Sequence, residues 1–470
     1  MSRDATPTSG GRSLLRTALS LRREEVGPVL IAASFFFCVL TALMLLRPAR
    51  DALGMERGIE SIRWLFAGTV LVTLAINPVF GWLVGRLRRL QVIAVTYGFF
   101  VLSLVGFWVL LRFAPGAVGE RSGQVFYVWF SVFNLFVTMV FWALLADRFG
   151  SDQGKRCFAL ISAGGTLGAI VGPWLTSRLA EPLGTPSLLL VASGFLLLAL
   201  VAARLLVRMT PDRIDADAAD AGASAADEIG SIGGSAWAGL HAVFRSRYLA
   251  GIAGYVLLMT VLATFIYFTR LHMVAAVSDD VDARAALLGN IDLWTQVAVL
   301  VLQLGLTGRL IERFGFGWAL ALLPIATAAG FIGLAVYGSF VVLIGLEAVN
   351  RAVQRGIARP AREALFTVVS REEKYKAKAF IDTFVYRAGD VVGAQVEGVL
   401  GRLGLAVGGL AGVVVPMALL WAALGIWLGR AQWRRASGSA ADAASASPDA
   451  VRDAPVLPAV HIAFASTRRF

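Results

Sequence analysis

The tripeptide Gly85-Arg86-Leu87 ends the second long apolar run of this chain, and Gly308-Arg309-Leu310 ends the eighth run 223 residues later. The tripeptide also occurs at residues 401–403, so its spacing is more informative than its presence. Arginines that end other apolar runs share this offset of 223 residues, in the pairs Arg47 with Arg270 and Arg148 with Arg371. A repeat of six apolar runs is typical of membrane proteins built from two related helical bundles around a central site.

The composition also indicates a membrane protein. The chain has 470 residues, of which 57% are hydrophobic and 16% are charged. Runs of about 20 apolar residues match the thickness of a bilayer core, and soluble domains rarely carry so many. The net charge of +12 could suggest nucleic acid, but the arginines are scattered over short loops and form no nucleic-acid-binding motif. We therefore expect the partners of this chain to include membrane lipid and not nucleic acid.

Twelve apolar spans can be read along the chain. Because backbone polar groups find no water partner in lipid, each span should be a helix. The predicted fold class is all-α and integral to the membrane, with twelve transmembrane helices in two six-helix pseudo-repeats. The spans are expected near residues 26–53, 64–85, 90–112, 124–147, 156–178, 186–208, 248–272, 285–307, 316–337, 339–369, 376–400 and 405–429. We expect the tenth span to be one long helix that Pro360 kinks.

Composition and charge divide the chain into five parts. Two stretches rich in Ala, Asp, Gly and Ser are expected to be disordered, and one of them joins the two bundles. Basic loop residues gather mainly on one side of the spans, which predicts that both termini lie in the cytoplasm. The predicted parts are a cytoplasmic N-tail at 1–25, an N-terminal bundle at 26–208, a cytoplasmic linker at 209–247, a C-terminal bundle at 248–429 and a disordered cytoplasmic tail at 430–470.

The tenth span carries the densest set of polar residues within an apolar run. Its members fall at i, i+3, i+4, i+7 and i+8, which is one face of a helix, and they are Glu347, Asn350, Arg351, Gln354 and Arg355. A charge at the bilayer centre costs about 2.5–3.5 kcal/mol, so these groups should meet water, one another or a bound molecule. Arginine forks suit phosphate or carboxylate, which favours a cavity for an anion. The alternative is a helix end outside the bilayer, with Arg351 paired to Glu347.

Other spans hold further candidates for such a site. They are Arg47, Arg50 and Asp51 in span 1, Arg270 in span 7, and Lys378, Asp382, Arg387 and Asp390 in span 11. Arg47 and Arg270 share a repeat position, so a structural role at an outer gate is as plausible as contact with a bound molecule. Asp382 and Asp390 could neutralise Arg387 or Lys378, or one of them could couple transport to protons.

Two further patterns have ordinary packing as their main explanation. Phe126, Phe130 and Phe133 form an aromatic face in span 4 that could stack a base, but packing between helices is the more common role. Glycines repeat every four residues in spans 5 and 11, which occupy equivalent places in the repeat and are expected to pack closely on neighbours. These glycines are Gly164, Gly168 and Gly172, and Gly389 and Gly393.

Several classes of function lack their sequence signals. The chain has no phosphate-binding G-x-x-x-x-G-K-[ST] loop and no arrangement of nucleophile, His and acid, so we expect neither an ATPase nor another enzyme. Two cysteines, Cys38 and Cys157, and three scattered histidines do not suggest a disulfide framework or a metal site. We expect no cofactor, and transport driven by gradients or exchange.

Three stretches resemble the ATP:ADP antiporter (nucleotide exchange) family, which is related to the major facilitator superfamily. They are LLRPARDALG at 45–54, KRCFALISAGGTLGAIVG at 155–172 and REEKYKAKAFIDTFVYRAGD at 371–390. The resemblance implies alternating-access exchange of a nucleoside triphosphate for a diphosphate in a bacterial inner membrane. It places the family's basic-acidic pair on Arg50 and Asp51, and its K-x-K-x-x-I-D run on Lys376, Lys378, Ile381 and Asp382. Arg50 and Asp390 stand where such exchangers usually have Lys.

Together these features predict a monomeric secondary transporter for an anionic small molecule, with nucleotide exchange as the first hypothesis. One alternative is a proton-coupled carrier of peptides, drugs or organic anions, in which Asp390 or Glu347 titrates. An alternative of another class is a membrane sensor or assembly partner that binds a ligand without transporting it.

Overall fold

The computed structural model describes residues 23–86, 89–114, 116–149, 151–210, 236–313, 315–405 and 407–445. Most of the predicted N-tail, the central part of the predicted linker and the end of the predicted tail lie outside these residues. Ten helices of the described chain are long and apolar enough to cross a membrane, which agrees with the all-α membrane fold expected from the sequence.

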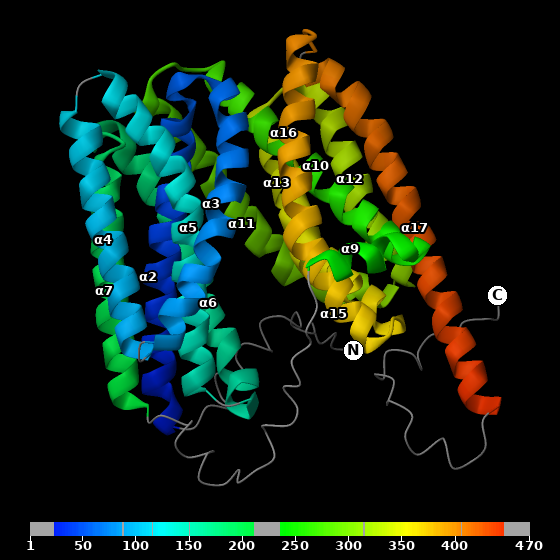
Figure 1. Cartoon of the computed structure of the whole chain (residues 1–470). Helices are drawn as coiled ribbons and strands as arrows, with labels where there is room; N and C mark the ends of the chain where they lie inside the picture. The colour runs from blue at the N-terminus through cyan, green and yellow to red at the C-terminus, as the bar shows by residue number, and fades with distance from the viewer. Residues whose placement is uncertain are drawn as a thin grey trace, which may run out of the picture.

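The N-terminal half is a bundle of six long helices, α2 to α7, drawn in blue to green in Figure 1. The helices follow the first six apolar runs of the sequence closely, because each run supplies enough apolar surface for one crossing. They are α2 (Arg23–Gly54), α3 (Ile59–Arg86), α4 (Arg89–Phe113), α5 (Gly116–Arg148), α6 (Ser151–Leu183) and α7 (Ser187–Met209).

The C-terminal half repeats this plan with more interruptions. Serine side chains accept a hydrogen bond from a backbone N–H at the start of three of its helices, as helix N-caps commonly do; these serines are Ser246, Ser339 and Ser370. Its helices are α9 (Ala236–Arg245), α10 (Arg247–Ala275), α11 (Val281–Arg313), α12 (Gly315–Tyr337), α13 (Phe340–Val353), α14 (Arg359–Leu365), α15 (Arg371–Phe380), α16 (Tyr386–Arg402) and α17 (Val407–Ser445).

The tenth and eleventh expected spans are each divided by a π-helical turn. Gln354–Ala358 separates α13 from α14, and Ile381–Val385 separates α15 from α16. Residues 340–368 are helical throughout, as expected of the tenth span, but the regular hydrogen-bond pattern changes at the π turn and not at Pro360. Pro360 lies in the first turn of α14, where its missing N–H is tolerated, and the backbone adjusts in the preceding π turn. That these two divided stretches cross the membrane, giving twelve spans, stays a prediction.

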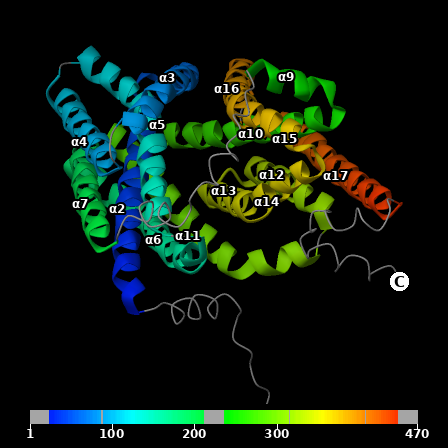
Figure 2. The same ribbon diagram turned by 60° about the horizontal axis from the view of Figure 1, so that its bottom comes forward.

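Two expected boundaries also differ from the structure. The helix α17 continues to Ser445, so residues 430–445 are helical and not part of a disordered tail. The short helix α9 lies within the stretch expected to be linker, and it packs beside α15, as Figure 2 shows. Its residue Val243 is buried in the core of the C-terminal half, and this burial explains why the end of the linker is ordered.

The glycine rows let helices approach closely at equivalent places in the two halves. A Cβ atom on Gly164 would lie 2.3 Å from the carbonyl oxygen of Ala33, and one on Gly168 would lie 2.4 Å from that of Phe37. In the C-terminal half, a Cβ on Gly389 would lie 1.7 Å from Oγ1 of Thr260. The rows therefore pack α6 on α2 and α16 on α10, as the repeat predicts.

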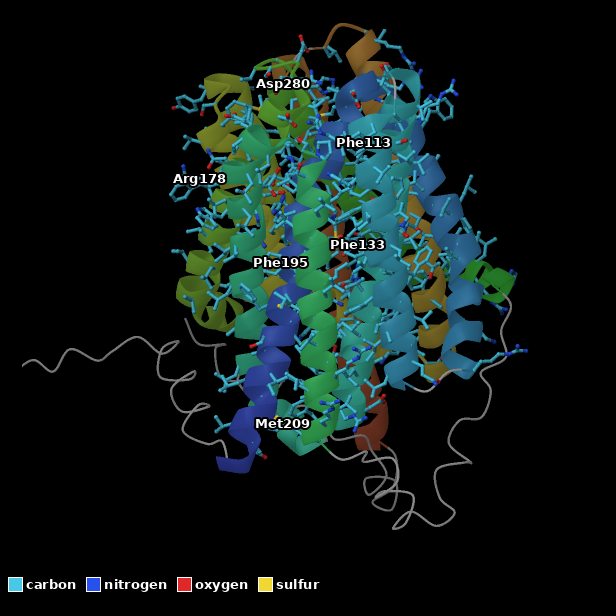
Figure 3. All side chains as sticks on the ribbon, turned by 90° about the vertical axis from the view of Figure 1, so that its left-hand side faces the viewer. Phe113, Phe133, Arg178, Phe195, Met209 and Asp280 are labelled. Atoms are coloured by element: carbon cyan, nitrogen blue, oxygen red, sulfur yellow. The ribbon has the colours of Figure 1, made fainter. Side chains whose placement is uncertain are left out.

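The two halves meet along α11, which packs against α6 and α2, and along α16, which packs against α3. We call the end of the molecule where α2 finishes and α3 begins the far end. Asp280 lies at this end and Met209 at the opposite end, as Figure 3 shows. The apolar core of the N-terminal half continues into the C-terminal half through residues of the far end, including Phe268, Leu271 and Val274.

Candidate functional site

A fully buried ion pair joins the two halves near the far end. Asp51 lies in the last turn of α2 and Arg270 lies near the end of α10, so the equivalent ends of two repeat-related helices face each other. Nη2 of Arg270 donates a hydrogen bond to Oδ2 of Asp51 at 2.7 Å. The two side chains are 0% and 1% exposed. Since an unpaired buried charge is strongly unfavourable, each of these residues requires the other.

Arg270 extends the pair into an ionic network inside the C-terminal half. Its Nη1 atom donates to Oδ1 of Asp292 on α11 at 2.9 Å and lies 3.8 Å from Oε2 of Glu347 on α13. Arg351, one turn along α13, contacts both acids: Nη2 lies 3.2 Å from Oδ1 of Asp292 and donates to Oε2 of Glu347. Three helices of this half therefore converge on one cluster of buried charge.

Two arginines of α2 complete the network from the N-terminal half. Nε of Arg50 donates to Oδ1 of Asp51 at 2.9 Å, and its guanidinium lies over the rings of Tyr127 and Phe130. Such cation–π contacts add to the attraction of the carboxylate. Arg47 is held more weakly, with Nε 4.0 Å from Oδ2 of Asp292 and 29% of its side chain exposed.

A pair of tyrosines ties the network to both halves. Tyr267 of α10 donates a hydrogen bond from its hydroxyl to Oδ1 of Asp51 at 2.8 Å. The hydroxyl of Tyr127 on α5 lies 3.0 Å from that of Tyr267. Both oxygens of Asp51 are thus occupied by partners from α2 and α10, which fixes the position of this carboxylate.

The network carries more positive than negative charge. Four guanidinium groups, of Arg47, Arg50, Arg270 and Arg351, face three carboxylates, of Asp51, Asp292 and Glu347. The excess is one positive charge among side chains that are mostly buried. Arg47 and Arg351 are partly exposed, at 29% and 16% of their side chains, whereas Arg270 is enclosed. An anion reaching the network would therefore meet Arg47 and Arg351 first.

Arg355 lies one helical turn beyond Arg351, on the π-helical turn that follows α13. It is exposed, and within the described residues it has no ion-pair partner. A π-helical turn widens the helix and re-aims its side chains, and such turns are frequent at functional sites. Arg351 and Arg355 thus form a short basic track that leads away from the network.

The remaining predicted site residues do not join this network. Asn350 donates to Oγ1 of Thr327 on α12 at 2.7 Å, so it contributes to packing within the C-terminal half. Each of the charged candidates in the eleventh span has an oppositely charged neighbour. Only the pair of Asp390 with Arg387 is one that the alternative named, because Lys378 and Asp382 pair with residues of α14. The pairs are Lys378 with Glu363, Asp382 with Arg362 at 3.5 Å, and Arg387 with Asp390 at 3.7 Å.

Asp292, Tyr127 and Tyr267 belong to the network but were not among the site residues predicted from the sequence. Asp292 was detectable, because it is a lone carboxylate within the apolar run of α11 and such residues are seldom without a partner. The tyrosines gave no signal, since an aromatic residue in a span is ordinary. In the aromatic face of span 4, Phe126 and Phe133 are fully buried and stack on Trp129, whereas Phe130 lies beneath the Arg50 guanidinium.

Comparison with known proteins shows the family to which this chain is similar. The model of the Major Facilitator Superfamily matches residues 29–278, which is more than half of the chain. ADP,ATP carrier protein 1 of Chlamydia trachomatis serovar D is 24% identical over 362 residues, covering 69% of this chain and 66% of that protein. The chain therefore matches just under two thirds of the length of this curated relative.

Two solved structures share the fold. A mutant form of the nucleoside transporter NupG superposes with a TM-score of 0.58 at 13% sequence identity, covering 87% of this chain and 99% of that one. A bacterial homologue of the human lysosomal transporter Spinster, in an inward-facing and unoccupied conformation, gives a TM-score of 0.55 at 10% identity and covers 88% and 99% of the two chains. At these identities the likeness concerns the fold alone.

Proposed function

This chain belongs to the Major Facilitator Superfamily and is a membrane transporter of that type, and we propose that it exchanges nucleotides of the ATP and ADP type by alternating access. The observation that carries the proposal is the excess of arginine over carboxylate between the two halves, close to the exposed Arg355. We further propose that both termini lie in the cytoplasm of a bacterial cell and that the far end faces outward.

The charge of the site selects the class of solute. A phosphate group offers several oxygens to guanidinium forks, and binding it would offset the positive excess of the network. Arg47, Arg351 and Arg355 are the residues we propose to bind the phosphates, because they are the accessible arginines. Arg270 and Asp51 are buried and paired with each other across the two halves, so we assign them to closure of the far end.

Closure and binding are linked because they use the same charged groups. The phosphates would compete with Asp292 and Glu347 for Arg351, and these two acids also hold Arg270. A bound anion therefore changes the balance of forces on the pair that joins the halves. Differential contacts of this kind are what a solute needs in order to shift a transporter between two states.

Two observations favour nucleotides among anions. The sequence matches a protein named as an ADP,ATP carrier over most of this chain, and the stretches at 45–54 and 371–390 resemble the nucleotide exchange family. Asp390, which stands where these exchangers usually have Lys, lies next to Arg387 and away from the network. This departure therefore leaves the basic track of Arg351 and Arg355 intact.

Counterflow in liposomes tests the proposal. Purified protein is reconstituted with ADP inside, and uptake of labelled ATP is followed with and without the internal nucleotide. We expect uptake that requires internal ADP. Uptake that instead follows an imposed pH gradient, without internal nucleotide, would favour the proton-coupled carrier. Nucleotide binding with no flux from intact vesicles would favour the sensor and contradict exchange.

A further inference from the structure

A second ionic cluster joins the halves at the far end, separate from the network around Asp51. Arg63, near the start of α3, reaches Glu397 on α16: Nη2 lies 2.9 Å and Nε 3.3 Å from Oε2. The two side chains are 6% and 4% exposed. Arg63 also lies 2.8 Å from Glu60, whose side chain is 60% exposed and therefore solvated. The buried pair is thus a contact between the N-terminal and C-terminal halves.

The surface of α16 is shaped to receive Arg63. A Cβ atom on Gly398 would lie 2.6 Å from Nε and 2.7 Å from Cδ of Arg63, so a larger residue would displace the arginine side chain from this position. On the other side, the guanidinium lies 5.5 Å from the centre of the Phe268 ring. The arginine is therefore enclosed from two sides and aligned with its carboxylate.

Glu397 has another basic neighbour, and this one belongs to the same half of the molecule. His272, in the last turn of α10, places Nδ1 3.4 Å from Oε1 of Glu397 and 2.9 Å from the carbonyl oxygen of Phe268. Because a carbonyl only accepts, Nδ1 carries the hydrogen of the neutral ring, and a further proton would bind at Nε2. With 41% of its side chain exposed, His272 can exchange protons with the solvent.

The two basic neighbours of Glu397 behave differently when the halves separate. Arg63 leaves with the N-terminal half, while His272 stays beside Glu397, since α10 and α16 pack together. A buried carboxylate that loses its partner is strongly unfavourable. Protonated His272 offsets this loss. While Arg63 is in place, Glu397 stabilises protonated His272 less, because the carboxylate is already neutralised by the arginine.

We propose that Arg63, Glu397 and His272 form a proton-responsive lock, in which a proton on His272 replaces Arg63 and favours opening of the far end. The lock rests on the alternating access proposed above and on no particular solute. Other charged groups at this end of α10 and of the elements packed against it are Glu60 of α3, Asp279, Asp280, Asp282 and Arg284 before and within α11, Arg402 of α16, and Arg270 of α10 itself.

The neighbouring charged groups do not replace His272 as a partner of Glu397. Arg284 is engaged by the carbonyl oxygen of Ser278 and by Asp279. Asp282 accepts a hydrogen bond from the backbone N–H of Thr185. Arg270 is enclosed by Asp51 and Asp292. His272 is therefore the basic group of the C-terminal half that remains beside Glu397.

The distance across the far end tests the lock without any solute. Spin labels are attached at Glu56→Cys and Val277→Cys, two exposed positions on opposite halves, in a background with Cys38→Ala and Cys157→Ala. Pulsed electron paramagnetic resonance in nanodiscs then gives the populations of short and long distances between the two labels. Lowering the pH from about 8 to about 5.5 should raise the ratio of long to short about two- to fivefold, the effect of a partly exposed ion pair.

Three variants decide the outcome. His272→Gln should abolish the pH response, and His241→Gln, on the exposed face of α9, should retain it as the matched control. Glu397→Gln removes the carboxylate that both basic residues share. The far end should then open at either pH, and its opening should not depend on pH. A response that survives in His272→Gln or Glu397→Gln, or a parent protein without one, overturns the lock. Because no nucleotide is added, a failed counterflow assay would leave this result standing.

Discussion

Asp51 is fully buried and accepts hydrogen bonds from Arg50, Tyr267 and Arg270, so both of its oxygens are occupied. Its three partners belong to two helices of opposite halves. A single carboxylate therefore determines how the ends of α2 and α10 approach each other. Charge at this depth is tolerated because each group neutralises another, and the removal of one member leaves the others unpaired.

Replacement of Asp51 should destabilise the whole protein. In Asp51→Asn the positive charges of Arg50 and Arg270 lose their shared partner, and we expect the free energy of unfolding to fall by about 3 kcal/mol or more. Thermal unfolding in detergent measures the change. Asp279→Asn is the matched control, because that carboxylate is fully exposed beside Arg284 and should have little effect. Equal melting temperatures for the two variants would contradict the role of Asp51.

The accessible arginines should determine affinity for the anion. Arg351→Gln and Arg355→Gln each remove a proposed phosphate ligand, and we expect the affinity for ADP to fall at least about tenfold, the effect of a charged hydrogen bond. Calorimetry on purified protein measures the affinity. Arg359→Gln, an exposed arginine one turn further along the chain, is the control and should bind normally. Unchanged affinity in both test variants would contradict the proposed site.

At the scale of the helix, glycine rows and π-helical turns have opposite effects. The rows of α6 and α16 let each helix pack tightly on its neighbour. Gly164 approaches the backbone of α2, and Gly389 approaches the side chain of Thr260 on α10. The π turns at 354–358 and 381–385 interrupt the regular ladder of helical hydrogen bonds in the C-terminal half, and they contain Arg355 and Asp382. The described part of the N-terminal half has no such turn.

A methyl group at Gly164 should separate α6 from α2. Its Cβ would meet the backbone of Ala33, which cannot rotate away as a side chain can, so we expect Gly164→Ala to cost about 1–3 kcal/mol of unfolding free energy. Gly194→Ala on α7 is the matched control, since a Cβ there has open space around it. That variant should be neutral or slightly more stable. Both are compared by thermal unfolding.

At the scale of the molecule, contacts that join the halves gather at the far end. They include Arg270 with Asp51, Arg63 with Glu397, Tyr127 with Tyr267, and the backbone of Thr185 with Asp282. The apolar core of the N-terminal half continues across the same region. The described structure therefore has a closed far end, which is one of the two states that alternating access requires.

Loss of the central pair should shift the molecule toward the other state. In Arg270→Gln the contact with Asp51 is lost, and we expect the long distance between labels at positions 56 and 277 to become more populated at constant pH. Arg284→Gln is the control, because its partners Ser278 and Asp279 lie in the same half. Identical distance distributions in the two variants would show that the central pair does not hold the far end closed.

The sequence alone determined the membrane fold and its division into two related halves. Apolar runs long enough to cross a bilayer leave a helix as the only backbone solution, and the constant offset of 223 residues exposed the repeat. Half of the site residues predicted from the sequence lie on one network in the structure, because buried charges in spans must find partners. Those residues are Arg47, Arg50, Asp51, Arg270, Glu347 and Arg351.

Only the tertiary structure decided which charge meets which. Asp292 and Tyr267 became partners of the network through the packing of α10 and α11 against the N-terminal half, and the pairing of Arg63 with Glu397 joins residues 334 positions apart. Helical periodicity determines the face on which a side chain lies, but not the helix that this face meets. The local pattern of span 10 is that of a regular helix and gives no signal for the π turn at 354–358.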